Sequence, residues 1–430
     1  MDALVGENLN CNTTDALHGR TRGPKCKVLL FSSMDGDFAP LIASRLKRMD
    51  VAVDALCPSH HVLAYSAAIT QVFRFGFATP LSNLSAAIAA SAADLIISCD
   101  DTARYTLSRL YRANAHSNDS KSVEARKLIE RSLGQREHFQ LAEEKSQLLA
   151  ALANSGVRLP RTLPIEGKNT LAEVCRTLKF PVVLKRDRTY GGTGVAICRD
   201  LEEAIQEYKR LSSPPALRDI LRQVIRKANF SALKDLFGVP QSAVVAQAYV
   251  DGRPANRAVS CWQGKALAGL TVIAIETSEN NPTRPATVVQ IVRNEEIDRM
   301  TEIVVSKLGL SGLCGLDFVL ETGTELPYFL ELNPRATPTC HLGRTIDSDV
   351  CGALGHAIMG TSPDDAMPGK DTDGPIALFP GELRRDPCSP HLFSAYHAVP
   401  WDDPKVLVQI LRRPREGLWQ KFSLFLRLPL

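Results

Sequence analysis

Carboxylate and amide side chains interrupt two otherwise apolar segments late in the sequence. Asp317 stands in Leu-Asp-Phe, and Glu331 and Asn333 stand in Leu-Glu-Leu-Asn. We expect two strands joined by a polar, glycine-containing turn. Because strand side chains alternate between faces, Glu331 and Asn333 share one face, and Asp317 on the neighbouring strand can face the same way. Two carboxylates and an amide oxygen form an all-oxygen set that suits Mg²⁺, a hard cation that also binds nucleotide phosphates.

The residues that follow indicate where this second strand ends. Pro334 cannot continue a central strand, so the strand stops where its polar side chains are placed. Arg335 comes next and can bind a phosphate through two parallel hydrogen bonds. The alternative is an amphipathic hairpin with one solvated face. That alternative does not explain why acidic residues interrupt apolar strands.

A second segment combines a lysine with a glycine-rich loop. Lys185 ends an apolar run, and Gly191, Gly192 and Gly194 precede the next apolar run. Backbone N–H groups exposed at glycines can cradle phosphate oxygens, and the lysine adds a positive charge. The pattern is not a Walker A loop, because no Gly-Lys-Ser/Thr follows, and it does not open a helix as a dinucleotide fingerprint would. Taken alone, the segment is equally compatible with a β-hairpin that has a glycine turn.

In order and spacing, the two segments together resemble the ATP-grasp superfamily. Its members have a lysine before a strand–loop–strand glycine lid and, much later, an acidic residue followed by Glu-x-Asn-x-Arg. The likeness covers about 140–345 and is closest to carbamoyl-phosphate-synthase and biotin-carboxylase-like members. It implies that ATP and Mg²⁺, for which Mn²⁺ can substitute, bind between two lobes. It also implies metal ligation by Asp317, Glu331 and Asn333, and catalysis by Lys185 and Arg335.

The same resemblance assigns further nucleotide-binding residues. Lys145 matches the family's earlier ATP-binding lysine, and Gln247-Ala-Tyr249-Val250 matches the hinge that holds adenine. The family usually has Glu at the first hinge position. Gln247 can still accept a hydrogen bond through its amide oxygen, although the departure leaves the nucleotide preference open.

Two other pairs of residues are candidates for roles in the site. Asp251 and Asn256 are both candidates for the ribose contact. Cys340 and His341 suggest a nucleophile and base, but adjacent residues on a strand point to opposite faces, which makes a poor dyad. We therefore expect Cys340 to be structural and His341 at most to line the acceptor site.

The resemblance implies a ligase that joins a carboxylate to an amine. The carboxylate attacks the γ-phosphoryl group, and the amine then displaces phosphate from the acyl-phosphate, giving an amide, ADP and phosphate. The alternative within enzymes is a carboxylase or carbamoyl-phosphate-type reaction with bicarbonate. A biotin-attachment Met-Lys-Met segment does not occur in the chain. The alternative outside enzymes is a non-catalytic ATP-binding protein. The sequence does not name the substrates, because fold does not determine function.

Composition narrows the class of protein and its partners. The 430 residues are 44% hydrophobic and 23% charged, with a net charge of +4, which requires no nucleic-acid partner. The eleven cysteines form no CxxC pair, so we expect reduced thiols and a cytoplasmic protein. No uncharged apolar stretch reaches 18 residues, so no membrane span is expected. We expect small-molecule carboxylate and amine substrates, and a homo-oligomer is compatible with the sequence.

The periodicity predicts a small parallel α/β domain, then a two-lobed ATP-grasp domain of mixed α/β and α+β character, then a C-terminal appendage. The predicted bounds are 1–24 for a disordered leader, 25–118 for the α/β domain and 119–366 for the ATP-grasp domain, with a lid at about 158–246. The appendage is predicted at 367–430. The apolar tail at 406–430 is expected to pack on the main domain rather than on a membrane surface.

Individual elements follow from the same patterns. The basic segment 212–240 is expected to be a mostly helical insertion or cap. Helices are predicted near 39–49, 137–154, 171–179, 201–211 and 295–308, and strands near 27–32, 51–56, 94–99, 181–185, 194–198, 243–250, 257–262, 267–275, 314–320 and 328–333.

Overall fold

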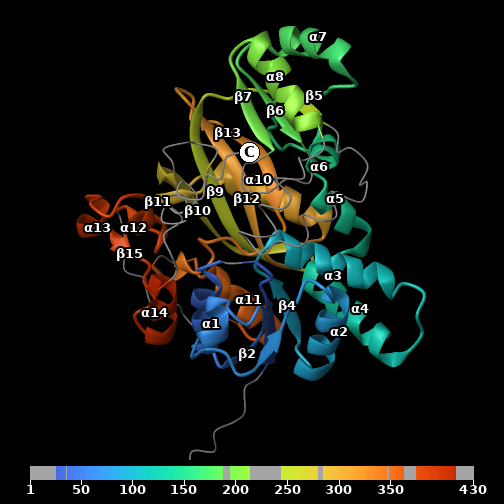
Figure 1. Cartoon of the computed structure of the whole chain (residues 1–430), viewed down its shortest axis with the longest axis vertical. Helices are drawn as coiled ribbons and strands as arrows, with labels where there is room; N and C mark the ends of the chain where they lie inside the picture. The colour runs from blue at the N-terminus through green and yellow to red at the C-terminus, as the bar shows by residue number, and fades with distance from the viewer. Residues whose placement is uncertain are drawn as a thin grey trace, which may run out of the picture.

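A computed structural model of the chain describes residues 26–34, 36–186, 194–213, 244–278, 284–345, 348–362 and 374–412. The described part of the chain contains three β-sheets, and Figure 1 shows them one above another, with the N-terminal sheet at the bottom, the seven-stranded sheet in the middle and the other four-stranded sheet at the top. The predicted leader, most of the 212–240 insertion, Gly191 and Gly192 lie outside the described residues. No helix in the described part of the chain is long and apolar enough to cross a membrane.

The N-terminal sheet is parallel, as predicted, with the strand order β3-β2-β1-β4. Alternate residues of β1 enter two different cores, since Val28 and Leu30 face one side and Leu29 and Phe31 face the other. Strand β3 was not predicted, because its three residues are not buried and show no apolar run. The strands are β1 (Cys26–Phe31), β2 (Val51–Cys57), β3 (Val72–Arg74) and β4 (Leu95–Ser98).

Helices cover both faces of this sheet. Helix α1 packs on one face, and helices α2, α3 and α4 pack on the other. Helix α4 begins after residue 118, and its Ala125 and Ile129 still belong to the N-terminal core. The predicted boundary at 118/119 stays a prediction. The helices are α1 (Ala39–Lys47), η1 (Val62–Tyr65), α2 (Pro80–Ser91), α3 (Asp101–Ala113) and α4 (Ser120–Leu133).

The central sheet has seven strands in the order β13-β12-β9-β10-β11-β14-β15. Its long strands are antiparallel, and helix α10 (Glu295–Leu308) packs on one face while α11 (Val350–Met359) packs on the other, against α1. Strand β11 was not predicted from the sequence. The strands are β9 (Gly252–Trp262), β10 (Lys265–Thr277), β11 (Ala286–Val292), β12 (Gly312–Glu321), β13 (Pro327–Asn333), β14 (Ile376–Ala377) and β15 (Tyr396–His397).

The third sheet has the antiparallel order β5-β8-β6-β7 and lies above the central sheet in Figure 1. Helices α7 and α8 share a core with it that includes Cys175, Leu184 and Tyr208. The elements are β5 (Thr162–Pro164), α7 (Lys168–Leu178), β6 (Val182–Arg186), β7 (Val195–Cys198), α8 (Leu201–Ser212) and β8 (Val244–Ala248). We call this unit the lid sheet.

The predicted continuous helix at 137–154 is wrong. The segment forms η2 (Arg136–His138), α5 (Phe139–Glu143) and α6 (Lys145–Leu152). Buried Glu144 interrupts it with an extended conformation, φ −109° and ψ 98°. Helical periodicity does not reveal such a break, because the apolar residues on both sides are still spaced for burial. The break makes Lys145 the first residue of α6.

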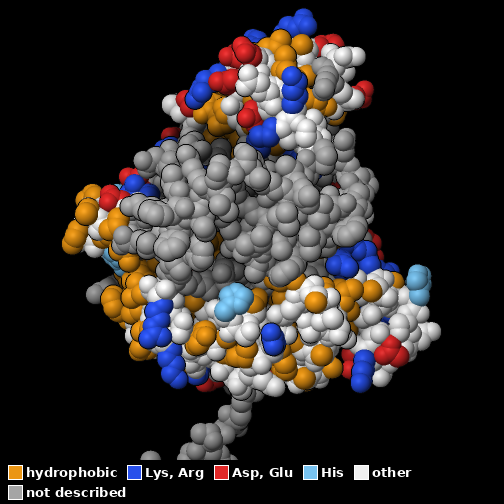
Figure 2. Space-filling view, in the orientation of Figure 1, with side chains coloured by type: hydrophobic (Ala, Val, Ile, Leu, Met, Phe, Trp, Pro, Cys, Tyr) orange, Lys and Arg blue, Asp and Glu red, His pale blue; other side chains and the backbone are white. Residues whose placement is uncertain are grey.

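The C-terminal part is joined to the central sheet through β14 and β15. It also contains α12 (Gly381–Arg385), α13 (His391–Ser394) and α14 (Pro404–Arg412). Val406 and Ile410 of α14 pack against Val62 and Phe379, as expected for this part of the tail, while residues 413–430 lie outside the described residues. Figure 2 shows hydrophobic side chains on the surface near these helices.

Candidate functional site

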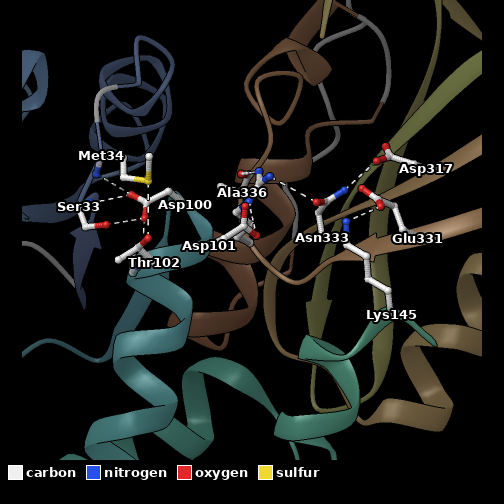
Figure 3. A network of polar contacts seen from close by, with 12 residues as sticks. Ser33, Met34, Asp100, Asp101, Thr102, Lys145, Asp317, Glu331, Asn333 and Ala336 are labelled. Atoms are coloured by element: carbon white, nitrogen blue, oxygen red, sulfur yellow. Dashed lines mark hydrogen bonds and ion pairs between the residues drawn. The ribbon is translucent and has the colours of Figure 1, made fainter. Parts of the chain in front are cut away.

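Three neighbouring strands of the central sheet bring polar side chains together. In the sheet register Asp317 of β12 lies opposite Glu331 of β13 and opposite Asn256 of β9. The Asn256 Nδ2 donates to Asp317 Oδ1 at 2.6 Å, and the Asn333 Nδ2 donates to Asp317 Oδ2 at 2.8 Å. The three predicted metal ligands therefore gather in one place, as their spacing indicated, and Figure 3 shows them side by side.

Asn256 belongs to this cluster, whereas the sequence indicated it only as a candidate for the ribose contact. Its Oδ1 accepts a hydrogen bond from Thr339 Oγ1 at 3.1 Å, so the amide is held on both sides. A polar side chain in the middle of an apolar strand was the available signal. Its partner could not be deduced, because the register of β9 against β12 is set between distant segments.

Lys145 contacts the cluster from α6. Its Nζ lies 2.6 Å from Glu331 Oε2, and both side chains are about a quarter exposed, at 29% and 23%. Burial disfavours the charge of both groups, but their attraction outweighs it. The pKa of Lys145 is therefore raised and the pKa of Glu331 is lowered.

Lys185 contributes a second positive charge from the lid sheet, at the end of β6. Burial has the largest effect and lowers the pKa of Lys185, Glu331 and Asp317 oppose the shift, the neighbouring Lys145 adds to it, and the resulting pKa is about 8. For Asp317, burial and the nearby charge of Glu331 raise the pKa to about 6, against the hydrogen bonds from Asn256 and Asn333. Two lysines and two carboxylates thus interact electrostatically across two sheets.

Arg335 follows β13 and lies between the cluster and the N-terminal unit. Its Nη2 donates to Asn333 Oδ1 at 3.3 Å, and its Nη1 donates to the carbonyl of Ala336 at the same distance. Its Nε lies 2.9 Å from Asp101 Oδ1 at the start of α3, with the geometry of an ion pair rather than an aligned hydrogen bond. Burial works against the charge, but Asp101 raises the pKa of Arg335.

The predicted adenine hinge follows the lid sheet. Gln247 is buried in β8, and its Nε2 donates to Thr162 Oγ1 of β5 at 3.0 Å. Tyr249 and Val250 are half-buried in the connection to β9. Within the described ranges these three residues form no hydrogen bond or ion pair with the carboxylate cluster, so the hinge stays a prediction.

The glycine loop is described only at its end. Gly194 precedes β7, and its carbonyl accepts the Arg186 N–H at 2.9 Å, which closes the β6–β7 pair. Gly191 and Gly192 lie outside the described residues, so their predicted contact with phosphate stays a prediction.

Cys340 and His341 lie in a turn before η5 (Leu342–Thr345), not in a strand as assumed. Pro334 and Pro338 prevent a strand from continuing there. The Cys340 Sγ accepts from the Thr337 N–H at 3.3 Å, and burial raises the pKa of this thiol. The ring nitrogens of His341 are buried, and burial lowers its pKa to about 4. A buried, protonated thiol is typical of a structural cysteine.

Comparison with known proteins finds a match to a known domain in the central part of the chain. A family model described as the ATP-grasp domain matches residues 142–339. The chain is 23% identical over 201 residues to the carbamoyl phosphate synthase large chain of Pseudothermotoga lettingae, and 23% identical over 203 residues to that of Kocuria rhizophila. The aligned regions cover 46% and 47% of this chain. The chain spans only 16% of the length of either relative.

Solved structures resemble a larger part of the fold. The biotin carboxylase domain of Hydrogenobacter thermophilus 2-oxoglutarate carboxylase, in complex with MgADP and bicarbonate, has a TM-score of 0.56 at 14% identity, covering 79% of this chain and 71% of that one. The N5-carboxyaminoimidazole synthetase of Staphylococcus aureus, complexed with ADP, has a TM-score of 0.56 at 13% identity, covering 79% and 78%. Residues 142–339 of this chain match the ATP-grasp domain model, and the fold of the chain resembles those of the biotin carboxylase domain and the N5-carboxyaminoimidazole synthetase.

Proposed function

We propose that this chain is an ATP-dependent carboxylate–amine ligase, which forms a carbon–nitrogen bond through an acyl-phosphate and releases ADP and phosphate. One observation carries the proposal. Three cations from separate segments act on the paired carboxylates: Lys145 contacts Glu331, and Lys185 and Arg335 interact with the carboxylates electrostatically. Such a concentration of cations beside paired carboxylates suits a polyphosphate with its metal ion.

The oxygen-rich cluster fits Mg²⁺ by its donor chemistry. Asp317, Glu331 and Asn333 offer two carboxylates and an amide oxygen, and no thiol or imidazole is among them. Hard oxygen donors of this kind suit Mg²⁺ or Mn²⁺. When bound, the metal would neutralise negative charge on the phosphates of ATP.

The proposed roles of the chain's residues follow from their charges. Lys145 and Lys185 bind the phosphates, and Arg335 stabilises the negative charge on the phosphoryl group during its transfer. The adenine binds at the hinge formed by Gln247, Tyr249 and Val250. The substrate carboxylate attacks the γ-phosphorus and ADP leaves. The amine then attacks the acyl carbon, phosphate leaves, and the nitrogen loses a proton. The glycine loop with Gly191, Gly192 and Gly194 would exclude water, which otherwise hydrolyses the acyl-phosphate.

Bicarbonate is a specific candidate for the carboxylate. The similar Hydrogenobacter domain is described in complex with MgADP and bicarbonate, and the curated relatives are carbamoyl phosphate synthase large chains. The chain would then be a carboxylase or carbamoyl-phosphate-type enzyme. A non-catalytic ATP-binding role is less consistent with the site, since both lysines and the full oxygen-donor set are present.

An ADP-release screen tests the proposal directly. The protein is incubated with ATP, Mg²⁺, and pooled amines with either carboxylates or bicarbonate, and new products are identified by mass spectrometry. We expect ADP release that depends on one carboxylate–amine pair and disappears in the Glu331→Gln variant. ADP release that stays at the level of the variant for every pool would refute a ligase activity.

A further inference from the structure

The first residue of α3 in the N-terminal unit touches the arginine proposed to act on the phosphoryl group. Asp101 Oδ1 lies 2.9 Å from Arg335 Nε, and the two side chains are 24% and 20% exposed. The two residues are far apart in the sequence. Asp101 begins α3, which packs on the N-terminal sheet, and Arg335 follows β13 of the central sheet. Figure 3 shows Asp101 beside Ala336, between the Asp100 contacts on one side and Asn333 on the other.

A neighbouring carboxylate fixes the start of α3. Asp100 caps this helix by accepting the Ala103 N–H at 2.8 Å. It also accepts the Ser33 N–H and the Ser33 hydroxyl, each at 2.6 Å, and so joins α3 to the end of β1. A carboxylate with this many donors is held firmly, and the adjacent Asp101 has its backbone position set by the same contacts.

A main-chain contact fixes the other side of the pair. The Ala336 N–H donates to the carbonyl of Ser98, the last residue of β4, at 2.9 Å. This hydrogen bond ties the segment that carries Arg335 to the strand that leads into α3. The distance between Asp101 and Arg335 is therefore constrained through the backbone on both sides.

We propose that Asp101 is a positioning residue of the N-terminal unit, which holds the guanidinium of Arg335 in its working orientation. The proposal rests on the proposed ligase function for the role of Arg335. An arginine side chain has several rotatable bonds, and restricting them in advance lowers the entropy lost when the guanidinium meets a phosphoryl group. Asp101 binds at Nε, whereas Nη1 and Nη2 lie toward Ala336 and Asn333.

The chain offers a matched control pair. Arg45 of α1 forms an ion pair with Asp349, the N-cap of α11, and these side chains are 20% and 26% exposed. This pair also joins the N-terminal helices to the helix on the central sheet, but its residues have no part in the proposed site. Asparagine is a good N-cap, so Asp349→Asn keeps the cap and removes the charge, as Asp101→Asn does at its site.

The experiment compares steady-state ADP release by Asp101→Asn, Asp349→Asn and the wild type. We expect kcat to fall about 10-fold in Asp101→Asn with KM for ATP changed less than about threefold, because the arginine is misplaced rather than lost. Asp349→Asn should stay within about twofold of the wild type. In an Arg335→Lys background, adding Asp101→Asn should lower kcat little further, since the group it positions is already gone.

A second measurement separates this proposal from the ligase function. The ¹⁵N–¹H signal of the Arg335 Nε–H group, assigned with Arg335→Lys, needs no substrate and should shift in Asp101→Asn but not in Asp349→Asn. If the first variant fails to fold, Asp101→Ser takes its place.

An unchanged signal together with kcat at the control's level would overturn the proposal, and so would fully additive losses in the double variant. A wild type without ADP release would refute the ligase function alone, and the Nε–H signal would still decide whether Asp101 holds Arg335.

Discussion

Lys145 Nζ lies 2.6 Å from Glu331 Oε2, although 186 residues separate them in the chain. The lysine thus contacts an oxygen that the proposed mechanism assigns to Mg²⁺. This ion pair compensates the charge of a carboxylate that is only 23% exposed. Binding of a metal and ATP would give Glu331 a new cation and Lys145 a new anion. The pair therefore lets the site exchange partners without leaving either charge uncompensated.

Replacing Glu331 with Gln tests the proposed metal site. The change removes one negative charge at nearly constant volume, so the fold should persist with little change in Tm. We expect kcat to fall at least about 100-fold, the size of loss seen when one electrostatic stabiliser is removed. ADP release as a function of Mg²⁺ concentration is the measurement. Near-normal turnover with an unaltered Mg²⁺ dependence would contradict the assignment.

Replacing Asn256 with Ala tests its role beside the metal ligands. The variant loses the donor to Asp317 Oδ1, so Asp317 is less well oriented and its carboxylate is harder to keep ionised. We expect the Mg²⁺ concentration for half-maximal activity to rise about 10-fold or more, with kcat largely recovered at saturating Mg²⁺. A variant with a normal Mg²⁺ dependence would show that Asn256 has no such role.

The pH dependence of ATP binding tests Lys185. Its pKa is lowered to about 8, chiefly by burial, so the nucleotide-free protein loses this charge as the pH rises through 8. ATP favours the protonated lysine, so the Kd for ATP should increase above pH 8, by up to about tenfold per pH unit. Lys185→Met should bind ATP more weakly and show a flatter profile between pH 7 and 9.

Lys209 supplies the control for this titration. It is an exposed lysine on α8 of the same lid sheet unit, so Lys209→Met removes an equal charge away from the proposed site. Isothermal titration with a non-hydrolysable ATP analogue and Mg²⁺ gives the Kd values. Identical profiles in the wild type and Lys185→Met would mean that this lysine does not meet the phosphates.

Because the imidazole of His341 is buried, we expect the free energy of unfolding to decrease in mild acid. Burial lowers the pKa of this imidazole to about 4, against a smaller opposing contribution from the backbone of Pro338, so the folded protein keeps it neutral where the unfolded chain is protonated. Its contribution to stability is therefore present above about pH 6.5 and is lost as the pH falls toward 4, by up to about 3 kcal/mol. The unfolding free energy of His341→Gln should fall less over this range. Parallel curves for the two proteins would contradict the prediction.

The amino-acid pattern predicted which oxygen-donor side chains gather in the candidate site and much of the local structure. Glu331 and Asn333 meet beside Asp317 because side-chain alternation has a period of two, a property of the strand itself. The parallel N-terminal sheet followed similarly from short buried runs. The adenine hinge, the glycine loop and the domain bounds remain predictions.

Tertiary structure alone decided which distant groups meet these residues. Lys145 faces Glu331 because α5 and α6 break at Glu144, and Asn256 faces Asp317 through the register of β9 on β12. The ion pair of Asp101 with Arg335 depends on how α3 lies against the end of β13. Local propensity and periodicity carry no information on such contacts, because register and docking are set by burial of whole faces in a common core. Charged side chains then pair with the partners that this packing brings within reach.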